Sequence, residues 1–83
     1  MNYHKFNGKT NIISELIAKE RKRQNLSYSE LSNKLQLIGI CLYKNDLFLI
    51  ENNRRLVRDF ELIGLFKVLN INYNDIEKLL EDF

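Results

Sequence analysis

The sequence predicts an all-α fold, and three observations support this assignment. Its 83 residues include no proline and only three glycines, whereas turn-rich β folds use both freely. Apolar residues recur at helical spacing in several segments. Ser, Asn or Asp stands before these segments, where helix N-caps belong. We therefore expect one compact domain of five short helices at residues 11–83, preceded by an N-terminal arm at residues 1–10.

The first helix is expected to begin near Asn11, because asparagine favours the N-cap position. Ile13, Leu16 and Ile17 follow at helical spacing and form its apolar face. Asn25 belongs to a residue type that tolerates the left-handed conformation, so we expect it to end this segment.

The second helix has the sharpest local signal. Ser27 and Glu30 have the spacing of a capping box, in which each side chain bonds the backbone N–H of the other residue. The helix is therefore expected to begin at Tyr28, with Leu31 and Leu35 one turn apart on its buried face. This places a tight turn between the first two helices.

A segment at residues 36–42, which contains an apolar run at residues 37–42, separates the second helix from the third. Periodicity alone does not distinguish a buried strand from an apolar loop here, and we interpret the run as a partly buried connection between helices. The third helix is expected to run from Tyr43 or Lys44 to Asn52, with Leu47 and Ile50 facing inward and Asn52-Asn53 supplying the stop.

Two further helices complete the predicted domain. Asp59 is expected to cap the fourth, and Asn70 to end it. Asn72 is the expected cap of the fifth. Both helices carry apolar residues at i, i+3, i+4 and i+7, which are Leu62, Leu65, Phe66 and Leu69 in the fourth and Ile76, Leu79, Leu80 and Phe83 in the fifth.

Charge is distributed unevenly along the chain. Residues 1–58 contain eleven Lys or Arg against five Asp or Glu, a net charge of +6, whereas residues 59–83 carry a net charge of −4. This asymmetry fits a molecule with one side that meets a polyanion, and equally fits solvated charges without a partner.

Several function classes find no support in the sequence. Cys41 is the only cysteine, which rules out an internal disulfide and suits a reducing compartment. No apolar run has the ~20 residues that a membrane span needs, and the N-terminus lacks a signal-peptide pattern. His4 has no second metal-ligand candidate nearby, and no catalytic set or phosphate-binding loop is present. We expect a cytoplasmic protein that is not an enzyme, with no cofactor, metal, small-molecule substrate or membrane partner.

The predicted order of elements has a functional meaning. Two short helices joined by a tight turn, followed by a third helix beside a basic loop, form the layout of a DNA-reading helix-turn-helix. The residues that support this layout occur in a characteristic order: Arg21, Leu26-Ser27-Tyr28-Ser29-Glu30-Leu31, Lys34-Leu35, Leu47, Ile50-Glu51, Arg55, the helix Leu62 to Leu69, Asn70-Ile71, Ile76 and Leu79-Leu80. This ordered set resembles the lambda-repressor-like (Xre-type) helix-turn-helix family over about Ile12 to Leu80. Residues 35–62 resemble a subgroup with a lengthened turn before the third helix.

The resemblance implies a sequence-specific DNA-binding transcriptional regulator, in the family usually a repressor, that binds double-stranded DNA as a homodimer. Lys44 matches a position that could read guanine, Asn45 one that could read adenine, and Leu49 one that could touch a thymine methyl group. Tyr43 matches a further position that faces base edges. Leu79, Leu80 and Phe83 could form a dimer surface or complete the core.

The resemblance also implies contacts away from the bases. Four residues match positions near DNA phosphates: Ser27 and Tyr28 at the start of the second helix, and Arg54 and Arg55 after the third. Arg21 and Glu51 match a pair that joins the first helix to the end of the third and fixes the third helix in place.

Some residues depart from the family pattern. Ser32 stands where alanine is usual, a change that packing should tolerate. Asp46 would repel phosphate, unless it accepts a hydrogen bond from cytosine or caps the helix. Phe48 and Leu49 are apolar where polar residues are usual, so either they pack against the run at residues 37–42 or at least one is exposed. An exposed apolar patch here would favour a second function, a protein-interaction module that keeps the fold.

Overall fold

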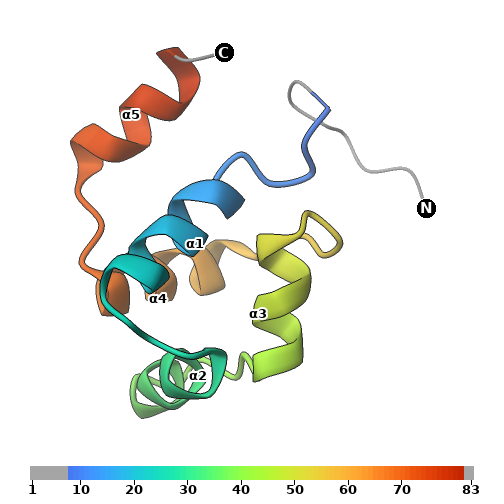
Figure 1. The fold of residues 1–83 in the computed structure, drawn as a ribbon, viewed down its shortest axis with the longest axis vertical. Helices are drawn as coiled ribbons and strands as arrows, with labels where there is room; N and C mark the ends of the chain where they lie inside the picture. Colours follow the sequence, from blue (N-terminus) through green and yellow to red (C-terminus); the bar gives the residue numbers. More distant parts are fainter. Residues whose placement is uncertain (1–7, 82–83) are drawn as a thin grey trace.

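A computed structural model describes residues 8–81 and confirms the all-α prediction (Figure 1). In the view of Figure 1, α2 lies at the bottom, α3 stands on the right, α1 and α4 lie in the middle, and α5 lies at the upper left. Tyr3, His4, Phe6, Phe83 and most of the predicted arm lie outside the described residues. The five helices are α1 (Ser14–Arg23), α2 (Tyr28–Leu37), α3 (Lys44–Glu51), α4 (Asp59–Leu69) and α5 (Tyr73–Glu81).

The start of α1 differs from the prediction. The helix begins at Ser14, and Asn11 is not its N-cap. The Asn11 side chain instead donates to the Arg55 carbonyl at 2.6 Å and accepts from the Val57 N–H at 3.2 Å. Its backbone N–H donates to Asn53 Oδ1 at 2.8 Å. Both ends of the side-chain amide thus bond the α3–α4 loop, and α1 has no side-chain cap.

Helix α2 begins as predicted. Ser27 Oγ accepts from the Glu30 N–H at 3.0 Å, and Glu30 Oε1 accepts from the Ser27 N–H at 3.0 Å, which confirms the capping box. These hydrogen bonds to the carboxylate lower the pKa of Glu30. The preceding turn contains Asn25 at φ 56°, in the predicted left-handed conformation.

The connection from α2 to α3 is longer than a tight turn and is anchored by side chains. Leu42 is fully buried, whereas Leu37 is exposed as the last residue of α2. The buried Ser32 Oγ donates to the Leu42 carbonyl at 2.7 Å. Ile40 lies on α4 at Gly64, where an added Cβ would come within 2.8 Å of Ile40 Cγ1. The run at residues 36–42 is therefore a partly buried connection, as predicted, except that α2 includes its first two residues.

Helices α3 and α4 bury the predicted faces. Leu47 and Ile50 of α3 are fully buried, and Asn53 follows at φ 58°. The prediction for the start of α4 is wrong, because Asp59 is the first helical residue and Arg58 occupies the cap position. The Arg58 N–H donates to Glu61 at 2.9 Å, so the carboxylate that satisfies this end comes from inside the helix.

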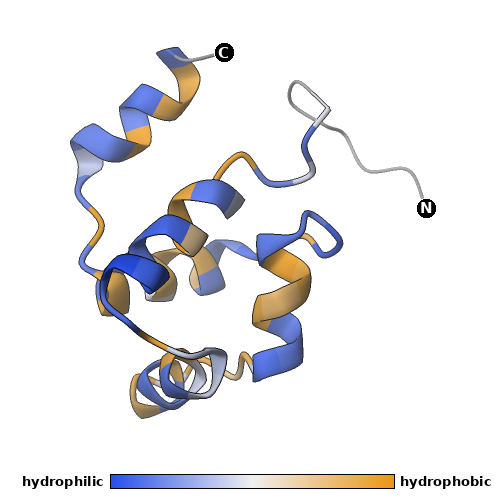
Figure 2. Ribbon diagram, in the orientation of Figure 1, coloured by the Kyte–Doolittle hydropathy of each residue, from blue (hydrophilic) through white to orange (hydrophobic). Residues whose placement is uncertain are grey.

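Helix α5 completes the fold at its edge. It contains no buried residue, although Ile76 and Leu79 are half-buried and Leu79 packs against the core. Leu80 is exposed. Apolar segments of α1, α3 and α4 meet in the middle of the molecule (Figure 2). The core consists of Ile13, Leu16, Ile17, Leu31, Leu35, Leu42, Leu47, Ile50, Leu65 and Leu69.

Candidate nucleic-acid interface

The candidate site is the outer face of α3. Leu47 and Ile50 attach the helix to the core, so the opposite side is open to solvent. Lys44 and Asn45, in the first turn, are exposed there, as is Tyr43 immediately before the helix. The structure thus brings three of the four predicted base-contacting residues together on one exposed helix end.

The fourth predicted base contact is placed differently. Leu49 is half-buried, whereas Phe48 has 42% of its surface exposed and lies one turn after Lys44. Asn52 lies one turn further and is also exposed, and its side chain donates to the Phe48 carbonyl at 2.8 Å. Asn52 was predicted only as the end of this helix, although its i, i+4 spacing from Phe48 indicates a place on the same face. The outer face of α3 therefore comprises Lys44, Asn45, Phe48 and Asn52.

The predicted pair between α1 and α3 forms. Arg21 Nε donates to Glu51 Oε2 at 2.7 Å and Arg21 Nη2 donates to Glu51 Oε1 at 3.1 Å, with side-chain exposures of only 12% and 5%. The hydrogen bond to Glu51 raises the pKa of Arg21. Because the contact is bidentate, it fixes the orientation of the end of α3 as well as its distance from α1.

Tyr28 belongs to the same cluster. Its hydroxyl donates to Glu51 Oε1 at 3.0 Å, and the Arg21 guanidinium lies 4.2 Å from its ring centroid. Phe48 meets the Tyr28 ring edge-on at 6.2 Å between centroids. Burial, followed by the hydrogen bond to Glu51, raises the pKa of Tyr28. Tyr28 thus joins the start of α2 to the end of α1 and the end of α3. Sequence reasoning missed this role.

The start of α2 is the first predicted phosphate-binding position. The Ser27 hydroxyl is engaged in the capping box and the Tyr28 hydroxyl in the bond to Glu51. The Tyr28 hydroxyl therefore has no spare donor for an anion, whereas the Ser27 hydroxyl acts as an acceptor in the capping box, and that bond leaves its own O–H unused. The first backbone N–H groups of a helix have no acceptor within the helix, so those of Tyr28 and Ser29 could also bind a phosphate.

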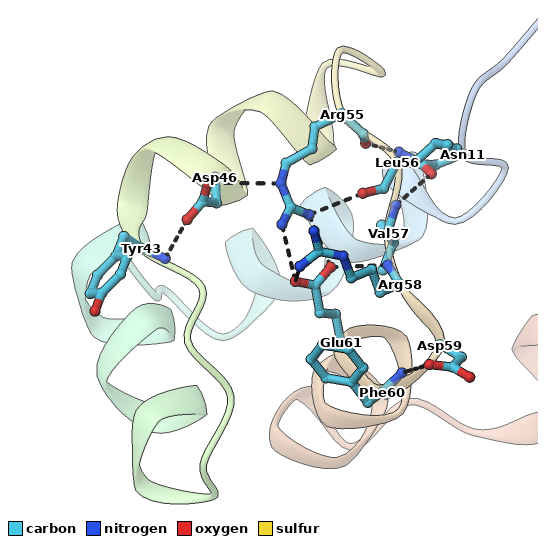
Figure 3. Close-up of polar contacts among 10 residues, drawn as sticks. All are labelled: Asn11, Tyr43, Asp46, Arg55, Leu56, Val57, Arg58, Asp59, Phe60 and Glu61. Atoms are coloured by element: carbon cyan, nitrogen blue, oxygen red, sulfur yellow. Dashed lines mark hydrogen bonds and ion pairs between the residues drawn. The ribbon is translucent and has the colours of Figure 1, made fainter. Parts of the chain in front are cut away.

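The second predicted phosphate-binding position is the loop after α3, and its arginines face different ways. Arg54 and Arg58 are exposed. Arg55 lies between Asp46 and Glu61 (Figure 3), and its guanidinium donates to both Glu61 oxygens, at 2.9 and 3.0 Å. Where the resemblance implied a phosphate contact at Arg55, the structure has an internal ion pair.

Glu61, in the first turn of α4, is the buried partner of Arg55 from this loop. Its side chain is only 3% exposed, and burial alone would raise its pKa. The hydrogen bonds from Arg55 and from the Arg58 N–H outweigh burial and lower the pKa of Glu61 overall. Glu61 is therefore ionised at neutral pH and holds Arg55 firmly.

The Asp46 carboxylate acts as a cap. Its Oδ2 accepts from the Tyr43 N–H at 3.0 Å, which agrees with the helix-cap interpretation of this residue. Its Oδ1 lies 3.8 Å from Arg55 Nε. The negative charge among the candidate base contacts is thus close to a cation of the same domain.

A groove of about 310 Å³ lies beside the outer face of α3. Two of the polar groups on its α2 side are engaged within the protein, because Gln36 donates to the Ser32 hydroxyl and that hydroxyl donates to the Leu42 carbonyl. Lys44 contributes the one cation among its lining residues, which are Ser29, Ser32, Asn33, Gln36, Tyr43 and Lys44.

Comparisons with known proteins yielded no significant match to a protein-family model, a curated protein or a solved structure. The resemblance to lambda-repressor-like domains therefore stays a prediction from the sequence. Within residues 8–81, no three His, Cys, Asp or Glu side chains are grouped to hold a metal ion. No helix in this described part has the length and apolarity to cross a membrane.

Proposed function

We propose that this protein is a sequence-specific DNA-binding transcriptional regulator of the helix-turn-helix type, which places the outer face of α3 in the major groove. One observation carries the proposal: α3 exposes Lys44 and Asn45 in its first turn while Leu47 and Ile50 anchor it to the core. An α-helix fits the major groove, and lysine and asparagine are side chains that discriminate between base pairs there.

Each exposed group has a proposed role. Lys44 donates to guanine O6 or N7, and Asn45 forms a bidentate contact with adenine N6 and N7. Phe48 takes the apolar contact with a thymine methyl group that the resemblance assigned to Leu49, because Phe48 is the more exposed of the two. Arg54 and the first amides of α2 bind phosphates and so fix the register of α3 on the duplex.

We also propose that the regulator acts as a homodimeric repressor in the cytoplasm. Helix-turn-helix domains usually bind two half-sites related by a twofold axis. Exposed Leu80 at the edge of the molecule is compatible with a dimer surface on α5. The single cysteine, Cys41, is a free thiol, as suits a reducing compartment.

Selection of bound sequences from random duplex DNA tests the proposal. We expect enrichment of a defined motif by the unmodified protein and loss of that motif by Lys44→Ala/Asn45→Ala. The matched control is Lys67→Ala/Asn74→Ala, which removes an exposed lysine and an exposed asparagine from α4 and α5. An unchanged motif after the α3 substitutions would refute the assigned contacts, and no enrichment at all would refute the function.

A protein-interaction module is the second candidate, favoured by the exposed aromatic rings of Tyr43 and Phe48. The two functions differ in their response to salt. DNA binding should weaken linearly on a log–log plot as salt rises, because counterions are released from phosphates. An apolar protein interface should be nearly insensitive to salt.

A further inference from the structure

Two carboxylates have the same role at the starts of α3 and α4: each accepts a hydrogen bond from the backbone N–H of the residue before its helix. Asp46 is the third residue of α3 and accepts from the N–H of Tyr43, the residue before that helix, at 3.0 Å. Glu61 is the third residue of α4 and accepts from the N–H of Arg58 at 2.9 Å. Each satisfies a donor that has no acceptor in its own helix.

The Arg55 guanidinium lies between these two carboxylates (Figure 3). It bonds Glu61 in bidentate fashion, at 2.9 and 3.0 Å, and its Nε lies 3.8 Å from Asp46 Oδ1. Side-chain exposure is 3% for Glu61, 24% for Arg55 and 32% for Asp46. The Arg55 carbonyl also accepts from Asn11 at 2.6 Å, so both its backbone and its side chain are held.

The two contacts of Arg55 differ in kind. The bidentate contact with buried Glu61 sets the guanidinium plane and position. The contact with Asp46 is too long for a hydrogen bond and acts through charge. Arg55 is thus fixed on α4 and presents a positive charge to the cap of α3.

We propose that Arg55 is a positioning residue for α3: it links the cap of α3 to the cap of α4 and neutralises Asp46 next to Lys44 and Asn45. This inference rests on the proposed DNA-binding function. Without Arg55, the Asp46 carboxylate would repel phosphates at the DNA-facing end of α3, and the start of the helix would lose its link to α4. Specificity depends on the orientation of α3, whereas non-specific affinity depends mainly on total positive charge.

The test compares Arg55→Gln with Arg54→Gln, which removes the neighbouring exposed arginine. Affinity is measured against salt for the selected sequence and for random duplex DNA. Arg54→Gln should reduce the magnitude of the slope of log affinity against log salt concentration by about 0.9, the value for one phosphate contact. It should weaken binding to the selected sequence and to random DNA equally. Arg55→Gln should leave the slope unchanged and reduce the preference for the selected sequence about tenfold, the size of one lost base contact. Asp46→Asn in the Arg55→Gln background should recover part of that preference, because the asparagine amide oxygen can still accept from the Tyr43 N–H without carrying the charge.

The proposal would be overturned if Arg55→Gln lowered the slope of log affinity against log salt concentration by the amount of one phosphate contact and left the preference for the selected sequence unchanged. That result would mean that Arg55 contacts a phosphate directly. If Arg55→Gln does not fold, Arg55→Lys keeps the charge and should show the same changes in smaller degree. If the unmodified protein binds no DNA, the proposed function is refuted, but the link that Arg55 makes between the starts of α3 and α4 can still be tested. Hydrogen exchange at the Tyr43 N–H should then accelerate in Arg55→Gln and not in Arg54→Gln, and equal exchange in both variants would overturn the link.

Discussion

Substitution of Glu51 by alanine probes the contact that holds the end of α3. Glu51 accepts three hydrogen bonds, from Arg21 Nε at 2.7 Å, Arg21 Nη2 at 3.1 Å and the Tyr28 hydroxyl at 3.0 Å. Removing one partner of a buried ion pair costs about 3–5 kcal/mol, because the remaining charge stays desolvated. Arg21 keeps its bond to the Leu26 carbonyl at 2.9 Å and its position over the Tyr28 ring. We therefore expect a loss near the lower bound, about 3 kcal/mol.

Thermal and urea unfolding followed by circular dichroism measure this loss. For a domain of this size, about 3 kcal/mol corresponds to a fall of roughly 12–24 °C in Tm. The control is Arg23→Ala, which removes the more exposed partner of the 2.7 Å pair that Arg23 forms with Glu20 on α1. That substitution should cost under about 1 kcal/mol, because the Arg23 side chain is 61% exposed. A similarly small loss in Glu51→Ala would refute the conclusion that the Arg21–Glu51 pair fixes α3.

Three further predictions follow from single contacts. Ser32→Ala should lower the free energy of unfolding in urea by about 1–2 kcal/mol, because it leaves the buried Leu42 carbonyl without its donor. The control Ser29→Ala, on the exposed side of α2, should lower it by less than about 0.5 kcal/mol. Equal losses in the two variants would contradict this account. Gly64→Ala should not raise the free energy of unfolding by the roughly 1 kcal/mol that alanine usually gains over glycine in a helix, because the added Cβ would come within 2.8 Å of Ile40. A rise in Tm that corresponds to the full gain would show that this close approach is absent. The pKa of Glu61 is lowered in the folded state, so its contribution to stability is present above the unfolded pKa near 4.5 and is lost as pH falls through the folded value. The urea midpoint of Glu61→Gln should therefore fall less steeply than that of the unmodified protein below about pH 4.5, and parallel curves would exclude Glu61 as a source of acid sensitivity.

Local signals in the sequence predicted the helices well, because the groups that satisfy them are near in sequence. The capping box of Ser27 and Glu30 closes within four residues, and left-handed Asn25 needs no distant partner. Asn11 misled the same reasoning, because its partners lie in the α3–α4 loop, more than forty residues away. Asp59 was misplaced because Glu61, two residues later, satisfies the donor before α4.

The candidate site was predictable in part. Periodicity placed Leu47 inside, and the family resemblance assigned Lys44 and Asn45 to the outer face. Neither could indicate that Arg55 turns inward, since the acceptor that holds it, Glu61, belongs to the next helix. The choice between a phosphate contact and an internal ion pair depends on three-dimensional proximity, which spacing along the loop does not encode.

The contacts that hold α3 against its neighbours explain why substitutions should change the orientation of this helix more readily than they unfold it. The helix has only eight residues, too few to be stable alone, so its position depends on its neighbours. Glu51 ties its end to α1, Asp46 connects its start to Arg55, and buried Leu42 anchors the connection before it. Loosening any one of these would tilt the helix while Arg54 kept its charge. Under the proposed DNA-binding function, selectivity among DNA sequences should therefore decline before non-specific affinity does, because base contacts require a fixed helix and phosphate contacts require mainly charge.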